Sequence, residues 1–463
     1  MNAVLREDPG EDNGRLYAAH RKIYPREVPG RFQRLRLAAT VALLGLFYFL
    51  PWLQWRGHQA VLFDLPARKF YIFGLTFFPQ DFFLLTWLLI IAALSLFFFT
   101  ALAGRLWCGY ACPQTVWTGV FVWMERMTEG TRQQRMKLDA APWSLNKAAR
   151  KSTKQLLWTS FALVTGITFV GYFTAIRSLL VEIVNWQVGG WEAFWILFYG
   201  FATYGNAGYL REQVCKYMCP YARFQGAMFD RNTLVISYDT ARGEPRGSRG
   251  KRVDHRKQGL GDCVDCTLCV QACPTGIDIR NGLQLECIAC AACIDACDTV
   301  MDQLQYPRGL IRYSTQNGLD GKKTRVLRLR TLIYGALLLA LTIGFGVAVH
   351  ERPLLILDVM RDRNALFRVT EEGNIENVYT VRIVNKDAFP HTLQLAVEGL
   401  EAATLEGDRT DYVVAPESVL SATVRIHVPP QTVAGGRDIV ILTRSTDGRM
   451  DAKSTARFIG PTP

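Results

Sequence analysis

The chain has 463 residues, and its 53 Lys and Arg against 41 Asp and Glu give a formal net charge of +12. Charged residues make up only 20% of the sequence, whereas a soluble domain usually has about 25%. These values exclude a disordered or collagen-like chain and argue against a wholly soluble protein. The twelve cysteines are too few for a secreted disulfide scaffold and too clustered for scattered core residues. We therefore predict a membrane protein with a metal-binding part.

Five uncharged segments approach the roughly 20 residues that a helix needs to cross a bilayer. They are residues 37–53, 82–103, 155–176, 193–210 and 331–349, and the fourth is the most polar of them. The N-terminal arm shows no cleavable signal pattern, so the first segment is interpreted as an uncleaved anchor.

Basic residues are concentrated before the first segment, between the second and third, and before the fifth, and they are scarce in the alternate loops. They are Arg6, Arg15, Arg21, Lys22, Arg26, Arg31, Arg34 and Arg36; Arg126, Arg132, Arg135, Lys137, Lys147, Arg150, Lys151 and Lys154; and Lys322, Lys323, Arg325, Arg328 and Arg330. The positive-inside rule then predicts a cytoplasmic N-terminus and an external C-terminus. These residues are interpreted as topology signals and contacts to anionic lipid, so the charge does not indicate nucleic-acid binding.

Two cysteine pairs follow the second and fourth segments. They are Cys108-x-x-x-Cys112-Pro113 and Cys215-x-x-x-Cys219-Pro220. The proline disfavours helix at the cysteine before it, so we expect a helix to end there and a new one to begin at the proline. Four soft thiols from two related positions could converge on Cu(I), zinc or an iron–sulfur cluster. The alternative is that they are small buried packing residues.

Eight further cysteines form two runs before the fifth segment. The first run is Cys263, Cys266, Cys269 and Cys273-Pro274, and the second is Cys287, Cys290, Cys293 and Cys297-Asp298. This spacing is the ligand pattern of bacterial two-cluster ferredoxins, in which the fourth cysteine of each run binds the other cluster. We therefore expect one 4Fe–4S cluster on Cys263, Cys266, Cys269 and Cys297, and a second on Cys287, Cys290, Cys293 and Cys273. Asp298 replaces the usual proline, which loses a rigid turn but no ligand.

Zinc knuckles or free thiols are the alternatives for these eight residues, but zinc sites of this type use two cysteine pairs and not a triple followed by a fourth. A cytoplasmic position also keeps the thiolates in a reducing compartment.

From Arg352 onward the sequence alternates apolar and polar residues in short runs, at 378–384, 392–397, 420–428 and 438–443. Such runs, separated by turn residues, predict a β-sandwich of roughly 100 residues. It contains no cysteine, and His350, His391 and His427 are too scattered to indicate a metal site.

The predicted fold is thus an α-helical integral membrane protein with five spans, an inserted two-cluster bacterial ferredoxin-like domain and a C-terminal immunoglobulin-like β-sandwich. The predicted domains are a basic arm at 1–36, a four-span membrane domain at 37–230, a cytoplasmic segment at 231–330 with the ferredoxin domain at about 255–305, the fifth span at 331–349, and the external sandwich at 350–463.

The two membrane pairs, the double ferredoxin run, the fifth span and the outer sandwich together resemble the FixG/CcoG (Rdx) cytochrome c oxidase accessory proteins from end to end. The resemblance implies a protein of the bacterial inner membrane that assembles the copper-containing cbb-type terminal oxidase and reduces Cu(II) to Cu(I) on the cytoplasmic side. It makes Cys108, Cys112, Cys215 and Cys219 the candidate copper site. It also implies a cytoplasmic electron donor and copper chaperones or oxidase assembly factors as partners, with a homodimer left open.

Another class of protein shares the paired membrane motif and the clusters: a quinol-linked membrane ferredoxin that passes electrons to a periplasmic reductase. Those proteins do not generally end in a cysteine-free sandwich. A third interpretation is a scaffold whose clusters only stabilise the fold.

Overall fold

A computed structural model describes residues 22–250, 256–432 and 435–461. Arg6, Arg15 and Arg21 of the predicted basic arm and residue 255, at the start of the predicted ferredoxin domain, lie outside the described residues. The chain forms two compact units, one of residues up to Leu53 together with Ile90–Leu339, and one of Gln54–Leu89 together with Ala340 onward.

Three helical segments within the described residues are long and apolar enough to cross a membrane. They contain α1 (Arg31–Phe49), α2 (Phe82–Ala103) and α14 (Leu329–His350). They match the first, second and fifth predicted spans. Most side chains of these helices are exposed, as expected for helices whose surroundings are lipid.

The third and fourth predicted spans lie in helices that are not among the three long, apolar ones. Helix α6 (Leu145–Val170) begins with a basic half and buries Trp158 and Ala162 against neighbouring helices, and α7 (Ile176–Val184) follows it after a turn. Helix α8 (Gly190–Thr203) has 14 residues before the backbone widens into a π-helical segment, η3 (Tyr204–Leu210). Five spans therefore remain a prediction, of which three have helices of the required length and apolarity.

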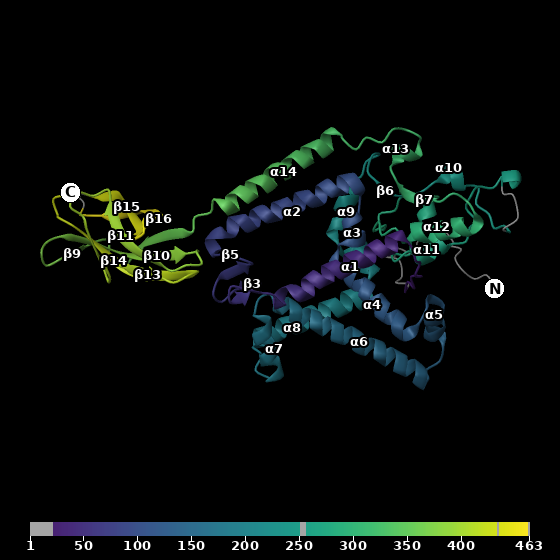
Figure 1. Cartoon of the computed structure of the whole chain (residues 1–463), viewed down its shortest axis with the longest axis horizontal. Coiled ribbons are helices and arrows are strands. Elements are labelled where there is room, and N and C mark those ends of the chain that lie inside the picture. The colour runs from purple at the N-terminus through teal and green to yellow at the C-terminus, as the bar shows by residue number, and fades with distance from the viewer. Residues whose placement is uncertain (1–21, 251–255, 433–434, 462–463) are drawn as a thin grey trace, which may run out of the picture. The chain divides into compact units, whose positions relative to one another are not determined.

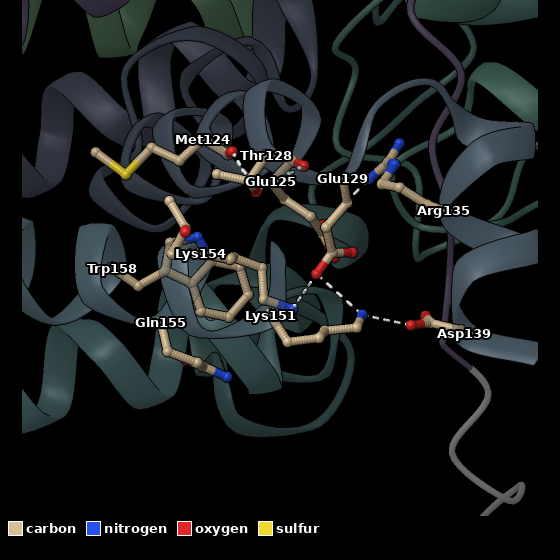
Figure 2. Close-up of polar contacts among 12 residues, drawn as sticks. Met124, Glu125, Thr128, Glu129, Arg135, Asp139, Lys151, Lys154, Gln155 and Trp158 are labelled. Atoms are coloured by element: carbon tan, nitrogen blue, oxygen red, sulfur yellow. Dashed lines mark hydrogen bonds and ion pairs between the residues drawn. The ribbon is translucent and has the colours of Figure 1, made fainter. Parts of the chain in front are cut away.

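An ion-pair network joins α6 to α4 (Pro113–Glu129) and α5 (Arg132–Ala140). The Glu129 side chain on α4 is fully buried, and its carboxylate lies 2.9 Å from Lys151 Nζ and 2.8 Å from Lys154 Nζ (Figure 2). The equally buried Glu125 pairs with Arg135 at 3.1 Å.

This network corrects part of the sequence interpretation. Arg135, Lys147 and Lys154 were interpreted as contacts to anionic lipid, but all three are buried. Arg135 and Lys154 pair with carboxylates, and Lys147 Nζ donates to the carbonyl oxygens of Asp139 and Ala141. Buried charges require such partners because desolvation otherwise costs several kcal/mol per ion.

The ferredoxin-like segment is bracketed by two strands. β6 (Val235–Tyr238) pairs antiparallel with β7 (Ile311–Ser314), and the helices α11 (Leu268–Ala272) and α12 (Ala292–Leu304) lie between them in sequence (Figure 1). The two cysteine runs therefore belong to one small domain with its own core, which includes Ile236, Ile294 and Met301.

The C-terminal region is a sandwich of two antiparallel sheets, as predicted (Figure 1). One sheet has the order β12-β14-β10-β8 with β9 on β10, and the other β13-β11-β15-β16. The strands are β8 (Leu355–Arg361), β9 (Arg368–Val369), β10 (Ile375–Asn385), β11 (His391–Glu398), β12 (Thr404–Gly407), β13 (Tyr412–Val414), β14 (Ser418–Val428), β15 (Gly436–Ser445) and β16 (Asp451–Ile459). Alternate residues of β10, such as Tyr379, Val381 and Ile383, form its core, because strand side chains alternate between faces.

Sequence patterns did not predict the short strands between α1 and α2. They are β1 (Gln54–Trp55), β2 (His58–Gln59), β3 (Val61–Asp64), β4 (Lys69–Ile72) and β5 (Leu75–Phe77). They belong to the same unit as the sandwich. Thr76 Oγ1 donates to Glu417 at 2.7 Å, and Lys386 Nζ lies 2.7 Å from the Asp81 carboxylate in a buried ion pair. The sandwich therefore docks on a loop of its own chain.

Candidate functional site

Four cysteines from both runs line one small cavity, which we call the first cysteine cavity. They are Cys263, Cys266, Cys269 and Cys297, and the apolar part of the wall includes Val300 and Leu310. Cys297 comes from α12, in the second run, while the other three come from the first. These are the four residues that the sequence assigned to one centre.

A second cysteine cavity is lined by Cys273, Cys287, Cys290 and Cys293, and also by Cys269. Here the fourth residue of the first run joins three of the second, as the crossed pattern predicts. Because Cys269 lines both cavities, the two lie next to each other.

The backbone adopts the same unusual conformation in both runs. Asp265 and Thr267 on either side of Cys266, and Ala289 and Ala291 on either side of Cys290, all have φ between 54° and 59°. Left-handed conformations cost non-glycine residues of order 1–3 kcal/mol each and persist where the structure requires them. The repetition indicates that each loop is shaped to wrap around a group bound at its cysteines.

The membrane-proximal cysteines Cys108, Cys112, Cys215 and Cys219 lie at helix boundaries, as predicted. Cys112 and Cys219 are extended N-cap residues with ψ of 127° and 111°, and α4 and α9 (Pro220–Ala227) begin at the following prolines. Cys108 lies in the short helix α3 (Leu106–Tyr110) and Cys215 in the π-helical turn η4 (Val214–Met218).

The four thiols lie within electrostatic range of one another. Burial, and to a smaller extent the neighbouring thiols of Cys112, Cys215 and Cys219, raise the pKa of the Cys108 thiol to about 12. Burial likewise raises the pKa of Cys215 to about 11. Cys108 Sγ also donates a 3.1 Å hydrogen bond to Gln225 Oε1. Within the described parts of the chain, no three His, Cys, Asp or Glu side chains form a ready single-ion site.

Sequence reasoning missed Arg105, which is buried at the centre of this region. Its guanidinium donates to the carbonyl oxygens of Leu285 and Ala222, and its positive charge lowers the pKa of Cys108 against the larger effect of burial. The only signal was a single arginine at the end of an apolar segment, which is also the usual appearance of a topology signal.

The second run packs directly on the membrane-proximal cysteines. Cys108 and Cys215 contact a buried cluster that contains Ile288 and Cys290. A Cβ at Gly109 would lie 2.8 Å from the carbonyl oxygens of Ile288 and Ala289, so only glycine permits this approach. Of the two cysteine cavities, the second is therefore the one that adjoins the membrane-proximal thiols.

Helix α1 is attached to the same run. The Asp295 carboxylate accepts hydrogen bonds from the backbone N–H groups of Phe32, at 3.1 Å, and Gln33, at 2.8 Å, in the first turn of the helix. Arg36 donates to the carbonyl oxygen of Cys290. These contacts link the predicted first membrane span to the ferredoxin-like domain.

The donor sets fit 4Fe–4S clusters. Each cavity is lined by the four thiols assigned to it, the ligand number that such a cluster requires, inside a largely apolar wall, and Cys269 lines the second cavity in addition. Burial raises the pKa of Cys269, Cys287 and Cys297 to about 12, so cluster binding must displace thiol protons.

Comparison with known families agrees with this chemistry. A family model described as a 4Fe-4S dicluster domain matches residues 210–316, and one described as a 4Fe-4S binding domain matches residues 84–127. A third, described as an IG-like fold at the C-terminus of FixG, matches residues 345–461. The match at 84–127 includes Cys108 and Cys112.

Several proteins are similar along most of the chain. The nitrogen fixation protein FixG of Rhizobium meliloti is 40% identical, covering 90% of this chain and 88% of its own length. Protein RdxB of Cereibacter sphaeroides is 40% identical over 91% of each chain. RdxA from the same organism is 40% identical over 83% of this chain and 84% of its own.

A crystal structure of a FixG-related protein from Vibrio parahaemolyticus is 28% identical over 23% of this chain and 96% of that one, with a TM-score of 0.22. The cysteine cavities and the matching iron–sulfur models make this chain an iron–sulfur protein of electron transfer. Its similarity to FixG, RdxA and RdxB over most of their length shows that it belongs to the FixG/Rdx family.

Proposed function

We propose that this protein reduces Cu(II) to Cu(I) at Cys108, Cys112, Cys215 and Cys219 and thereby supplies copper for assembly of a cbb-type terminal oxidase. The observation that carries the proposal is the packing of Cys108 and Cys215 on the loop of the second cysteine run. A soft-ligand cluster that touches an electron carrier is what a copper-reducing site requires.

The chemistry needs few groups. A bound 4Fe–4S cluster supplies one electron at a time, and conversion of Cu(II) to Cu(I) consumes one electron and no proton. The thiols then favour the product, because soft sulfur ligands prefer Cu(I). Arg105 holds α3, α9 and the second run together through its two carbonyl contacts.

The proposed setting is the bacterial inner membrane, with the clusters in the cytoplasm and the sandwich outside. The distribution of basic residues supports this orientation. On this proposal the partners are a cytoplasmic copper source and the oxidase assembly factors.

The first test replaces Cys215 and Cys219 with serine, which keeps side-chain size but substitutes a harder, normally protonated oxygen. The clusters are reduced anaerobically with dithionite, excess reductant is removed, Cu(II) is added, and Cu(I) is followed with a chelator. We expect loss of copper retention and a rate lower by roughly tenfold or more, with iron content unchanged.

Tyr221→Phe is the matched control, since it alters a residue two positions after Cys219 and keeps all four thiols and the Met218 thioether. Its side chain is exposed, and we expect its reduction rate to equal that of the unaltered protein. An unchanged rate in the double serine variant would contradict the proposal.

A second function for the same four cysteines is favoured by the match of residues 84–127 to a 4Fe-4S binding domain. In this alternative they hold a third cluster, and the protein only conducts electrons. Iron analysis separates the two, since two clusters give about eight irons per chain and three give about twelve.

A further inference from the structure

A large cavity, with a volume of about 1120 Å³, lies beside the second cysteine cavity. Thr275, Ile288 and Cys290 line both cavities. A molecule bound in the larger one would therefore contact the wall of the predicted second cluster. Cys215 of the membrane-proximal group also lines the larger cavity.

The walls of this cavity are divided by chemistry. One part is apolar and comes from two helices, with Leu37, Val41 and Leu44 on α1 and Val116, Val120 and Trp123 on α4. On α1 the lining runs from Gln33 to Phe49, a length of roughly 24 Å at the helical rise per residue.

The other part of the wall is polar and includes the end nearest the cysteines. Gln33, Arg36, Gln114 and Glu212 line it, and Glu212 is buried. Charged side chains, among them Arg26 and Glu27, also line the cavity. An elongated apolar space that ends in polar and charged groups is the form of a site for an amphipathic small molecule.

We propose that this cavity binds an isoprenoid quinol, with the ring at the polar end beside Cys290 and the tail between α1 and α4, and that this quinol is the electron donor. The inference rests on the proposed function in so far as the cysteine cavities hold 4Fe–4S clusters. A quinol donor would come from the bilayer, so it differs from the cytoplasmic electron donor that the family resemblance implies.

The electron balance suits this carrier. When the two O–H bonds of a quinol break, the products are a quinone, two protons and two electrons. Clusters held by the thiols of the two cysteine cavities would take one electron each, which is enough to reduce two Cu(II) ions in succession. The protons leave through the Glu212 carboxylate to water.

An anionic phospholipid would also fit an amphipathic space, but the position of the cavity against Cys290, which also lines the second cysteine cavity, favours a redox-active quinol. Much of the cationic lining already has partners: Arg126 pairs with Glu27, and Arg135 and Arg211 both pair with Glu125. Arg36 and Arg132 donate to the carbonyl oxygens of Cys290 and Tyr24. Arg135 and Arg211 share one carboxylate and Arg26 also lines the cavity, so the lining keeps a net positive charge, and retained anionic phospholipid is an outcome that the experiment must measure.

Two glycines of the apolar wall allow a sharp test. A Cβ at Gly45 on α1 or Gly119 on α4 would meet no atom within 4 Å. A leucine at either position would extend into the cavity without displacing backbone. Gly346 on α14 is equally open and does not line the cavity, so Gly346→Leu is the matched control.

The full chain is placed in nanodiscs of neutral lipid without quinone, and binding of decyl-ubiquinone is measured at equilibrium. Cluster reduction by decyl-ubiquinol is followed by absorbance and electron paramagnetic resonance. For Gly45→Leu and Gly119→Leu we expect binding weaker by roughly tenfold or more and slower reduction by the quinol. Dithionite should reduce the clusters fully in both variants and in the Gly346→Leu control.

Binding and quinol reduction that are equal in all variants would overturn the proposal. The proposal would also be overturned if the purified protein retained anionic phospholipid and decyl-ubiquinol failed to reduce the clusters. Copper reduction by dithionite-reduced protein is measured in the same samples. If it persists when quinol fails, only the donor assignment is wrong; if it fails in every sample, the proposed copper site is wrong.

Discussion

Gly109 lies in tight contact with the backbone of the second cysteine run. It directly follows Cys108, and the missing side chain lets the carbonyl oxygens of Ile288 and Ala289 approach its Cα. Since those atoms belong to backbone, a larger residue must move the loop and not merely a flexible side chain.

We therefore expect Gly109→Ala to separate Cys108 from the second run while leaving both cysteine cavities intact. Transfer of electrons from reduced clusters to Cu(II) should slow by roughly tenfold, as small misplacements of reacting groups commonly do. Stopped-flow absorbance of the clusters measures this rate, and Gly205→Ala is the control, because a Cβ there meets nothing within 4 Å. Equal rates in the two variants would show that this contact does not carry the transfer.

Cys273 tests the crossed assignment of the cysteines. Its thiol lines the second cavity with Cys287, Cys290 and Cys293, although it belongs to the first run. We expect Cys273→Ser to lose mainly the cluster of the second cavity and Cys266→Ser mainly that of the first, each leaving about four irons per chain. Electron paramagnetic resonance distinguishes the remaining centres. If both variants lost the same centre, the ligation would not be crossed.

At the scale of elements, helix α1 depends on a distant cap. Its own N-cap residue, Gly30, supplies no side-chain hydrogen bond, and Asp295 on α12 accepts from the backbone of Phe32 and Gln33 instead. A Cβ at Gly30 would collide with the Asp295 side chain, so the glycine makes room for the cap. A carboxylate at this end also interacts favourably with the positive pole of the helix dipole.

Replacing Asp295 with alanine should free the first turn of α1, with a loss of about 1–2 kcal/mol in local stability. The Asn variant, which keeps an acceptor oxygen, should recover part of it. Amide hydrogen exchange at Phe32 and Gln33 measures the effect. Unchanged protection in the Ala variant would mean that packing alone holds the helix in place.

Asp298 stands where the ferredoxin motif usually has proline, and this difference affects helix α12. After Cys273, Pro274 follows a helix of five residues, whereas α12 continues through Cys297 and Asp298 to Leu304. The Asp298 carboxylate also accepts a 3.0 Å hydrogen bond from the backbone of Gly309. The aspartate thus permits a longer helix and holds the chain that follows it.

Asp298→Pro, which introduces the usual ferredoxin residue, should therefore destabilise this protein by about 3 kcal/mol or more, because proline removes an N–H inside the helix and clashes with the preceding turn. Asp298→Ala should cost only about 1 kcal/mol for the lost hydrogen bond. Thermal unfolding and iron content are the measurements. A proline variant as stable as the alanine one would show that α12 does not need to be continuous here.

At the scale of the whole molecule, the arrangement in the membrane follows from the proposed orientation. A reporter that is active only in the periplasm should work when fused after Pro463 and be silent when fused after Gly318. The reverse result would place the cysteine runs outside and remove the argument from a reducing compartment. An additional fusion after Arg177 tests whether the third and fourth predicted spans exist.

Much of this architecture could be predicted from local patterns. Apolar runs of sufficient length identify α1, α2 and α14 because a bilayer demands continuous apolarity. Period-two alternation identifies β10, β11, β14 and β15 because one face of each is buried. The cysteine spacing predicted the four thiols of the first cavity and four of the five that line the second, to which the structure adds Cys269. Cys-Pro predicted where α4 and α9 begin, since both patterns depend on a few neighbouring residues.

Other features depend on contacts between residues far apart in the chain, and only the tertiary structure decided them. A lysine in a basic loop has the same appearance in sequence whether it faces lipid or, like Lys154, a buried glutamate. The cap of α1 by Asp295, the approach of Gly109 to Ile288 and the cavity between α1 and α4 leave no periodic signal. Hydrophobic and cysteine patterns indicate which residues a segment must bury or use as ligands. The residue that contacts a given charge or glycine depends on how distant segments pack together.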